Sequence, residues 1–376
     1  MSAKKACALK ASVILGTRPE IIKMAPVIRV LEARGIDHFI LHTGQHYSYN
    51  MDRIFFEQLS LPLPKYNLNV GSGTHGEETG KMLIGIENIL LEEKPDLVFV
   101  EGDTNTVLAG ALAAAKLRIK VGHVEAGLRS RDMSMPEEIN RIITDHISNY
   151  LFAPTEASKN NLLREGLDAS KISVTGNTIV DAIQQHLKLT QSQCNDGMAG
   201  LGVGIGVGAS IGNYFLVTMH RQENVDDPEK LKRIMDGLGE VSARFGKAII
   251  YPIHPRTRKR LKEFGIATGG SIKLIDPVDY LAFLRLESQA DLILTDSGGV
   301  QEEACILGVP CVTLRENTER PETLDVGANA LAGTDPGRIM EKAEEMLAKR
   351  GGWRNPFGDG KAAERIVGIV AGTPSA

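Results

Sequence analysis

Residues 11–35 read ASVILGTRPEIIKMAPVIRVLEARG, and this stretch decides the fold class. The apolar run at residues 11–15 predicts a buried strand, residues 16–20 a polar loop, and residues 21–34 an amphipathic helix that Gly35 closes. Further strands are predicted at residues 39–43, 97–101 and 121–125, with an alanine-rich helix at residues 107–116. Strands that alternate with helices long enough for crossovers indicate a parallel sheet with helices on both faces.

A second α/β region follows a break in the pattern. Between residues 190 and 212 the periodicity gives way to seven glycines, a composition that favours a linker or surface excursion. Strands are then predicted at residues 214–219, 248–252, 292–295 and 310–314. We therefore predict an α/β fold of two doubly wound, Rossmann-like domains that face each other across a cleft, at residues 1–185 and 213–355, joined by a linker at residues 186–212.

Composition excludes several classes of protein. The chain has 376 residues, 42% hydrophobic and 24% charged, which is typical of a globular protein with two to three domains. A net charge of -4 provides no basic field for nucleic acid. Four cysteines without a CxxC pair indicate reduced thiols in the cytoplasm. No apolar run approaches the ~20 residues of a membrane span, so we expect no membrane association.

Two patterns suggest other chemistry but are weak. Residues 71–76, GSGTHG, match the dinucleotide fingerprint GxGxxG, yet the segment before them is short and partly polar. We interpret them as a loop in which Thr74 or a nearby polar group caps the following helix. The HxE pattern of His123 and Glu125 is found in zinc deaminases, but no PCxxC partner completes a metal site, so we expect no metal.

Two loops that follow strands are suited to an anion. In the first, Gly16 permits close backbone approach, Arg18 supplies a bidentate cation, and the helix beginning near Pro19 directs its N-terminal dipole to the same place. In the second, Ser297, Gly298 and Gly299 provide a hydroxyl and open N–H groups at a helix start. One loop in each domain would hold a diphosphate from both sides. A tight turn with Arg18 on the surface is the alternative.

Carboxylates and histidines also follow predicted strands. Asp103 and Glu125 stand at two strand ends, and Glu137 lies nearby in MPEE. Three carboxylates in one cleft, without cationic partners near them in the sequence, would raise at least one pKa, as acid/base catalysis at neutral pH requires. His220 could place a protonatable imidazole against a leaving phosphate, and His254 is a second strand-end histidine. Individually, Glu137 could merely begin a helix and His220 could bind backbone.

Together these residues resemble one enzyme family, the non-hydrolysing UDP-N-acetylglucosamine 2-epimerases. The resemblance covers almost the whole chain, and its motifs occur in the family's order: GTRPE from residue 16, GDT from 102, GHVEAGLR from 122, PEE from 136, TGNT from 175, HR from 220 with EN from 223, TDSGG from 295 with QEE from 301, ERPE from 319, and NPFGDG from 355.

The resemblance implies a GT-B-like fold, with residues 356–376 crossing back to the first domain, and a homodimer. It implies a UDP-sugar substrate bound by residues 213–355 and no cofactor. The catalytic residues would be Asp103, Glu125, Glu137 and His220. The residues that bind UDP or the sugar would be Arg18, Lys23, His254, Ser297, Gly298, Gly299, Glu303 and Arg320. For Glu303, the expected contact is with the ribose hydroxyls.

Departures from the family concern activation by substrate. Bacterial relatives bind a second UDP-N-acetylglucosamine with residues that include two glutamines after the second strand. Gln45 matches the first, but Ser48 stands at the second, and an arginine expected in the loop after Leu68 is missing. Gln45 is therefore the candidate activator residue, and we expect weak or altered activation.

The predicted reaction is the reversible C2 epimerisation of UDP-N-acetylglucosamine to UDP-N-acetylmannosamine. C2 has no adjacent carbonyl, so direct deprotonation would be slow, and either transient oxidation by NAD or elimination of UDP to a glycal is needed. Carboxylates and cationic loops without a convincing dinucleotide fingerprint favour elimination. A hydrolysing epimerase, a GT-B glycosyltransferase and a catalytically inactive UDP-sugar sensor are the alternatives, although the intact acids argue against the sensor.

Overall fold

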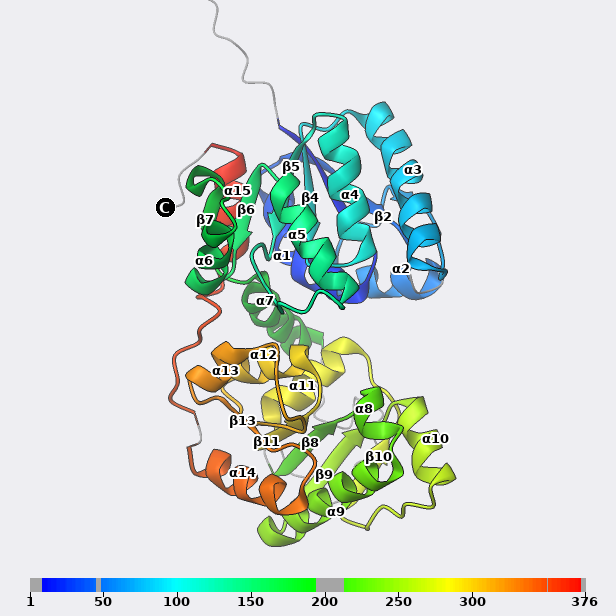
Figure 1. Cartoon of the computed structure of the whole chain (residues 1–376), viewed down its shortest axis with the longest axis vertical. Coiled ribbons are helices and arrows are strands. Elements are labelled where there is room, and N and C mark those ends of the chain that lie inside the picture. Colours follow the sequence, from blue (N-terminus) through cyan, green and yellow to red (C-terminus); the bar gives the residue numbers. More distant parts are fainter. Residues whose placement is uncertain (1–8, 45–48, 194–212, 350, 373–376) are drawn as a thin grey trace, which may run out of the picture. The chain divides into compact units, whose positions relative to one another are not determined.

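The chain forms two compact units, which we describe separately. The computed structural model describes residues 9–44, 49–193, 213–349 and 351–372. Unit 1 comprises Met1–Gln185 and Phe357–Ala376, and unit 2 comprises His186–Pro356 (Figure 1). Helix α7 (Thr178–Gln193) includes residues 186–193 of the expected linker, and residues 194–212, with their glycines, lie outside the described residues.

Unit 1 contains a seven-stranded parallel sheet. Its strand order is β3-β2-β1-β4-β5-β6-β7. In chain order the strands are β1 (Lys10–Leu15), β2 (Asp37–His42), β3 (Tyr66–Asn67), β4 (Leu97–Glu101), β5 (Lys120–Val124), β6 (Tyr150–Ala153) and β7 (Ile172–Val174). The accompanying helices are α1 (Arg18–Ala33), α2 (Tyr49–Gln58), α3 (His75–Glu93), α4 (Asn105–Lys116), α5 (Pro136–Ile147), α6 (Glu156–Arg164), η1 (Ala169–Lys171), α7 and α15 (Ala362–Val370).

The order of this sheet explains where the functional loops lie. The chain moves from β1 to β2 in one direction and from β4 to β5 in the other, so right-handed crossovers place α1 and α4 on opposite faces. Side chains of β1, β4, α3 and α4 form an apolar core on one face. Because all strands are parallel, the loops after β1, β4 and β5 meet at one edge of the sheet, and β1 and β4 flank the point where the order reverses.

Unit 2 repeats this arrangement with six parallel strands in the order β10-β9-β8-β11-β12-β13. The strands are β8 (Tyr214–Thr218), β9 (Ala248–Pro252), β10 (Ile272–Ile275), β11 (Leu292–Thr295), β12 (Cys311–Thr313) and β13 (Asn329–Leu331). The helices are α8 (Gln222–Val225), α9 (Pro228–Phe245), α10 (Pro255–Glu263), α11 (Tyr280–Gln289), α12 (Gly298–Leu307), α13 (Pro321–Asp325) and α14 (Pro336–Lys349). The reversal here lies between β8 and β11. The predicted α/β class with two doubly wound sheets is confirmed.

Local signals account for the element boundaries. Gly35 has φ +63° and follows α1, as predicted. Thr74 accepts a hydrogen bond from the Glu77 N–H and caps α3, which begins at His75, so the interpretation of GSGTHG as a capped loop is confirmed. Asp181 on α7 accepts hydrogen bonds from the N–H groups of Ala362 and Ala363 and thereby caps α15. Within the described ranges, no helix is both long and apolar enough to cross a membrane.

Candidate active site

Acidic side chains gather at the carboxyl ends of β4 and β5 in unit 1. The two strands pair in parallel with Glu101 opposite Val124, so Asp103 and Glu125 leave the same edge of the sheet. Glu125 is 8% exposed and has φ +70°, in the left-handed region that a non-glycine residue rarely adopts. Such strain persists only where the surrounding structure enforces it, and it is concentrated at functional sites.

Lys23 of α1 supplies a cation to this cluster. Its Nζ lies 2.5 Å from Glu125 Oε2 and 3.3 Å from Glu101 Oε1. Glu101, the last residue of β4, is 2% exposed, and burial raises its pKa well above the usual range, with Lys23 opposing and Glu125 reinforcing that rise. Glu101 was not among the predicted site residues, although a carboxylate that ends the buried run LVFV was a usable signal.

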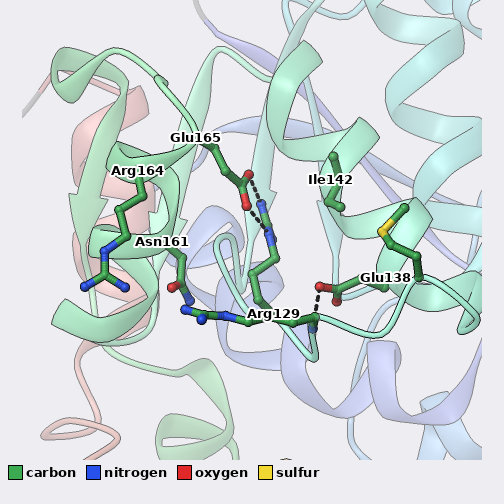
Figure 2. Close-up of a pocket in the computed structure, with 8 residues that line it drawn as sticks. Arg129, Glu138, Ile142, Asn161, Arg164 and Glu165 are labelled. Carbon is green, nitrogen blue, oxygen red and sulfur yellow. Dashed lines mark hydrogen bonds and ion pairs between the residues drawn. The ribbon is translucent and has the colours of Figure 1, made fainter.

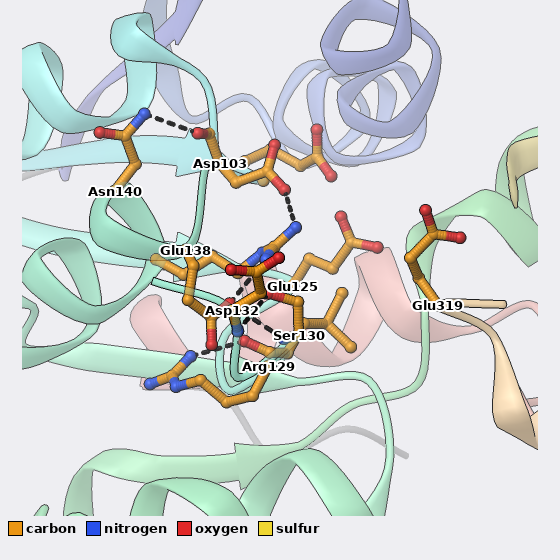
Figure 3. Close-up of polar contacts among 12 residues, drawn as sticks. Asp103, Glu125, Arg129, Ser130, Asp132, Glu138, Asn140 and Glu319 are labelled. Carbon is orange, nitrogen blue, oxygen red and sulfur yellow. Dashed lines mark hydrogen bonds and ion pairs between the residues drawn. The ribbon is translucent and has the colours of Figure 1, made fainter. Parts of the chain in front are cut away.

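Arg141 of α5 is the second cation of the site. Its guanidinium contacts Asp103 Oδ2 at 2.5 Å and Glu138 Oε2 at 2.7 Å. Asn140 Nδ2 donates to the Asp103 carbonyl oxygen at 2.9 Å, as Figure 3 shows. These acids were predicted to have no cationic partner nearby in the sequence, and the fold brings Lys23 to Glu125 and Arg141 to Asp103 from other elements. The raised pKa at this edge of the sheet is that of Glu101, which was not one of the three predicted carboxylates.

The two adjacent glutamates of the PEE motif have different environments. Glu138 is 1% exposed and accepts hydrogen bonds from the N–H groups of Ser130 and Arg131, each at 2.9 Å. Burial raises the pKa of Glu138, but these hydrogen bonds and Arg141 outweigh burial and hold it below the usual range. Glu137 is exposed on the first turn of α5. Glu138 therefore anchors the loop before α5, whereas Glu137 remains accessible.

In the loop after β1, a carboxylate of the protein itself binds the backbone N–H groups. Glu20 Oε2 accepts the N–H groups of Gly16 at 2.5 Å and Thr17 at 3.1 Å, and Thr104 Oγ1 donates to Oε1. A Cβ on Gly16 would lie 2.1 Å from the Thr106 hydroxyl, so close packing explains this glycine. The Gly16 N–H, in the loop that was predicted to approach an anion, is thus bound by Glu20, whose pKa burial raises to about 7. The Arg18 guanidinium carbon lies 5.7 Å from the ring centre of Phe55.

His123 links β4, β5 and α5. Its Nε2 donates to the Gly102 carbonyl at 2.9 Å, and its Nδ1 lies 2.7 Å from Asp145 Oδ1. Asp145, buried on α5, also accepts the Gly127 N–H at 3.1 Å and pairs with Arg129 at 2.8 Å. Both ring nitrogens of His123 are therefore occupied by hydrogen bonds that hold the loops after β4 and β5. Asp145 is a supporting residue that the sequence analysis did not single out.

A pocket of about 380 Å³ lies beside this network (Figure 2). Its lining residues are Arg129, Arg131, Met133, Glu138, Ile142, Asn161, Arg164 and Glu165. Arg129 donates two hydrogen bonds of 2.7 Å to Glu165, visible as paired dashed lines in Figure 2. Because Arg129 and Glu138 are both engaged within the protein, they serve to hold the pocket wall together.

In unit 2, His220 lies directly beyond the end of β8. Asp296, which is buried after β11, accepts hydrogen bonds from the backbone N–H groups of His220 and Arg221 at 3.0 and 2.9 Å. The His220 ring is about half exposed, and its Nδ1 lies 3.4 Å from Asp296 Oδ1. Burial raises the pKa of Asp296, but the hydrogen bonds and His220 hold it below the usual range. Asp296, which the sequence analysis quoted only within TDSGG, thus fixes the His220 loop.

A second pocket, of about 260 Å³, lies at the carboxyl ends of β8 and β9. Its lining residues are Thr218, Met219, His220, Pro252, His254, Pro277, Val278 and Phe283. The rings of His220 and His254 are 6.2 Å apart, and His254 Nδ1 accepts the Arg256 N–H at 3.2 Å as it caps α10. The structure therefore brings the two predicted histidines of unit 2 together in one partly apolar pocket.

The TDSGG loop follows β11, at the carboxyl-end edge of the unit 2 sheet. Ser297 is the N-cap of α12, but its side chain makes no capping hydrogen bond, and Gly298 and Gly299 form the first turn. Arg320, a predicted UDP ligand, pairs with Glu302 at 2.9 Å. Ser297, Gly298 and Gly299 thus occupy the predicted strand-end loop, with Arg320 held by an acid of the same helix.

Glu303 faces a second buried carboxyl group. Glu287 of α11 is fully buried, and its burial first, and then the charge of Glu303, raise the pKa of Glu287 well above its usual range. Glu303, which was predicted to bind the ribose hydroxyls, is thus close enough to the buried Glu287 to affect its pKa. Glu287 was not among the predicted site residues. Gln45, the candidate activator residue, lies outside the described residues.

Comparison with known proteins places this geometry in a family. The family model described as UDP-N-acetylglucosamine 2-epimerase matches residues 29–371. UDP-N-acetylglucosamine 2-epimerase of Methanocaldococcus jannaschii is 62% identical over 366 residues, covering 96% of this chain and 99% of that protein. The crystal structure of that archaeal epimerase in complex with UDP-GlcNAc and UDP matches with a TM-score of 0.84 and 61% identity, over 96% of this chain and 99% of the other.

A more distant likeness concerns the fold alone. MurG of Acinetobacter baumannii is 13% identical, with a TM-score of 0.57 over 97% of this chain and all of that chain, which agrees with the GT-B-like fold that was predicted. The full-length matches to epimerases are far more specific. On their evidence, the chain belongs to the UDP-N-acetylglucosamine 2-epimerase family.

Proposed function

We propose that this chain is a non-hydrolysing epimerase that interconverts UDP-N-acetylglucosamine and UDP-N-acetylmannosamine by elimination and re-addition of UDP. The observation that carries the proposal is the group of carboxylates at the ends of β4 and β5, Asp103 and Glu125, each in contact with a cation from another element. Such a group can move protons at a carbon while the fold keeps the acids in place.

The reaction requires two proton transfers at C2. In the first step a carboxylate removes the C2 proton, the C1–C2 bond becomes double, and the C1–O bond breaks with its electrons passing to the β-phosphate of UDP. In the second step an acid returns a proton to the opposite face of C2, and the phosphate oxygen attacks C1. We assign these transfers to Asp103, Glu125 and Glu137, which are either partly exposed or at the strained end of a strand. Inversion at C2 follows because removal and return use different faces.

Unit 2 binds the nucleotide in this proposal. The pocket lined by His254, Val278 and Phe283 offers apolar and aromatic surface of the kind that receives a nucleobase. His220 stands at its edge, where a protonated ring would stabilise charge on the departing diphosphate. The N-terminus of α12, with Ser297, Gly298 and Gly299, supports the phosphates, Glu303 accepts the ribose hydroxyls, and Arg18, Lys23 and Arg320 are the cations that assist UDP or substrate binding.

One experiment separates this mechanism from the alternatives. In deuterium oxide, UDP-N-acetylmannosamine formed from unlabelled substrate should carry deuterium at C2 and none at C3, because the returning proton exchanges with solvent. No added NAD should be needed, and free UDP should not accumulate at early times. A hydrolysing epimerase would release UDP and free sugar in equal amounts, and a glycosyltransferase would leave C2 unchanged. Protium retained at C2 throughout turnover, measured by NMR and mass spectrometry, would refute the elimination.

The homodimer remains a prediction, and one surface of unit 1 supports it. Ile84 and Leu91 of α3 and Ile139 and Ile143 of α5 are exposed apolar side chains on helices that both pack beside α4. Apolar surface of this kind is typical of contacts between subunits. Multi-angle light scattering should give about twice the 40.7 kDa mass of the chain, and replacing Ile84 and Leu91 with aspartate should reduce that value to the monomer.

A further inference from the structure

Glu101 is a buried carboxylate beside Glu125 to which the proposed reaction gives no task. Its side chain is 2% exposed and lies between α1 and the end of β5. Lys23 Nζ approaches Glu101 Oε1 to 3.3 Å and Glu125 Oε2 to 2.5 Å, so the two carboxyl groups contact the same ammonium group. Two buried carboxyl groups beside a single ammonium repel each other when both are ionised, and this repulsion favours a proton on one of them.

The contacts indicate which of the two holds this proton. The ammonium of Lys23 is closer to Glu125, and an adjacent cation favours the ionised form of a carboxyl group. The Glu101 side chain is also the more deeply buried of the two, 2% exposed against 5%, and burial favours the neutral form. Both differences place the proton on Glu101 and the negative charge on Glu125.

We propose that Glu101 is a positioning residue that stays protonated at neutral pH and donates a hydrogen bond to Glu125, so that Glu125 is the carboxylate that removes the C2 proton. This rests on the proposed role of Glu125. The hydrogen bond and the Lys23 contact fix the Glu125 carboxylate from two sides, which explains how a residue at φ +70° is held in place. In this step the C2 proton of the substrate is transferred to Glu125, and the proton on Glu101 is not transferred.

The surrounding charges determine the expected pH dependence. Lys23 and Glu20 face Glu101 from α1, and Glu125 faces it from the end of β5; His123 of β5 binds the carbonyl of Gly102, the next residue. Burial is the largest influence and raises the pKa of Glu101, Glu125 and Glu20 raise it further, and Lys23 lowers it. Loss of this proton at alkaline pH would put two anions beside one ammonium and displace Glu125. Turnover should therefore fall on the alkaline side as Glu101 ionises.

Two substitutions separate positioning from packing. Glu101→Gln keeps a neutral donor of the same shape, so turnover at neutral pH should fall by less than about 10-fold and the alkaline decline should disappear. Glu101→Ala removes the donor, so turnover should fall by roughly 10- to 100-fold, the loss expected for a hydrogen bond to a charged group. Asp181→Asn, which changes a buried acid that caps α15, is the matched control and should retain the alkaline decline.

Infrared spectroscopy tests the proton itself, independently of turnover. The difference spectrum between the wild-type protein and Glu101→Gln at neutral pH should contain the C=O band of a protonated carboxylic acid. Loss of carboxylate bands instead, or equal impairment of Glu101→Gln and Glu101→Ala, would overturn the proposal. If Glu125→Gln kept full turnover, the proposed function of Glu125 would fail, whereas the infrared band would still report the proton on Glu101. The two failures are thus distinguishable even if Glu101→Ala does not fold.

Discussion

Replacing Lys23 with methionine removes the cation that two buried carboxyl groups share. Methionine retains most of the aliphatic length of lysine, so the volume of the side chain changes little. What is lost are the 2.5 Å contact with Glu125 and the 3.3 Å contact with Glu101. The Lys23 side chain is only 15% exposed, so water cannot readily replace it. The substitution therefore tests how far this one residue stabilises the acidic edge of unit 1.

The magnitude depends on pH, and the sign follows from the pKa shifts. Removing one partner of a buried ion pair costs about 3–5 kcal/mol when the remaining charge has no partner. Glu101 already has a pKa raised above its usual 4.5, and loss of the cation, which lowers that pKa, raises it further. The folded protein then holds protons that the unfolded chain releases, so stability falls as pH rises above about 4.5. The loss should be small near pH 5 and approach its full value near pH 8.

Urea denaturation followed by far-UV circular dichroism measures this loss at both pH values. Trp353, the single tryptophan of the sequence, lies in unit 2, where its indole N–H donates to the Cys305 carbonyl. Its fluorescence therefore reports on unit 2, and the loss should appear in the transition of unit 1. Lys349→Met is the matched control: Lys349 pairs with Glu345 at an exposed position, so its loss should cost less than about 1 kcal/mol.

Two results would refute this reasoning. Equal destabilisation of Lys23→Met at both pH values would show that the acids do not take up protons when the cation is removed. A loss no larger than that of Lys349→Met would show that Lys23 contributes no more than a surface ion pair.

Three further predictions follow. Asp103→Asn, Glu125→Gln and Glu137→Gln should each lower turnover by roughly 100- to 10,000-fold, as loss of acid/base catalysis does, with UDP affinity in calorimetry unchanged; near-normal turnover in all three would refute their assignment. Arg18→Ala should weaken UDP binding by about 1.5–3 kcal/mol, and an unchanged dissociation constant would exclude the contact. Glu20 has a pKa raised to about 7, so wild-type stability should decline between pH ~4.5 and ~7 and Glu20→Gln should flatten that decline in urea denaturation.

The fold was predictable because its signals are local. Buried strands followed by polar loops and amphipathic helices are visible in a single sequence, and the parallel arrangement follows from the length of the crossovers. The positions of Asp103 and Glu125 were predictable for the same reason, because loops after parallel strands meet at one edge. The partners of these acids were not predictable. Lys23 and Arg141 reach them from helices that are 102 and 38 residues away in the chain, and only the fold determines such contacts.

Buried acids were missed for a related physical reason. Glu101 and Glu287 occupy positions where composition alone predicts an ordinary strand or helix residue, and their significance depends on a second acid that approaches from another element. Glu20 was quoted as part of a motif, but its role in binding the N–H groups of the Gly16 loop depends on the turn geometry at the start of α1. A sequence shows which residues can ionise, whereas burial and contact determine which of them do.

The two glutamates of the PEE motif also differ in a way that the sequence alone does not predict. Glu137 and Glu138 are chemically identical, and successive residues of an α-helix point about 100° apart, so only one of them can face the loop at residues 130–131. In this chain Glu138 faces the loop. Its two carboxylate oxygens accept hydrogen bonds from two backbone N–H groups and from Arg141. Glu137 points about 100° away around the helix, and its side chain is exposed. The burial of one glutamate and the exposure of the other thus follow from where each residue lies around the helix axis.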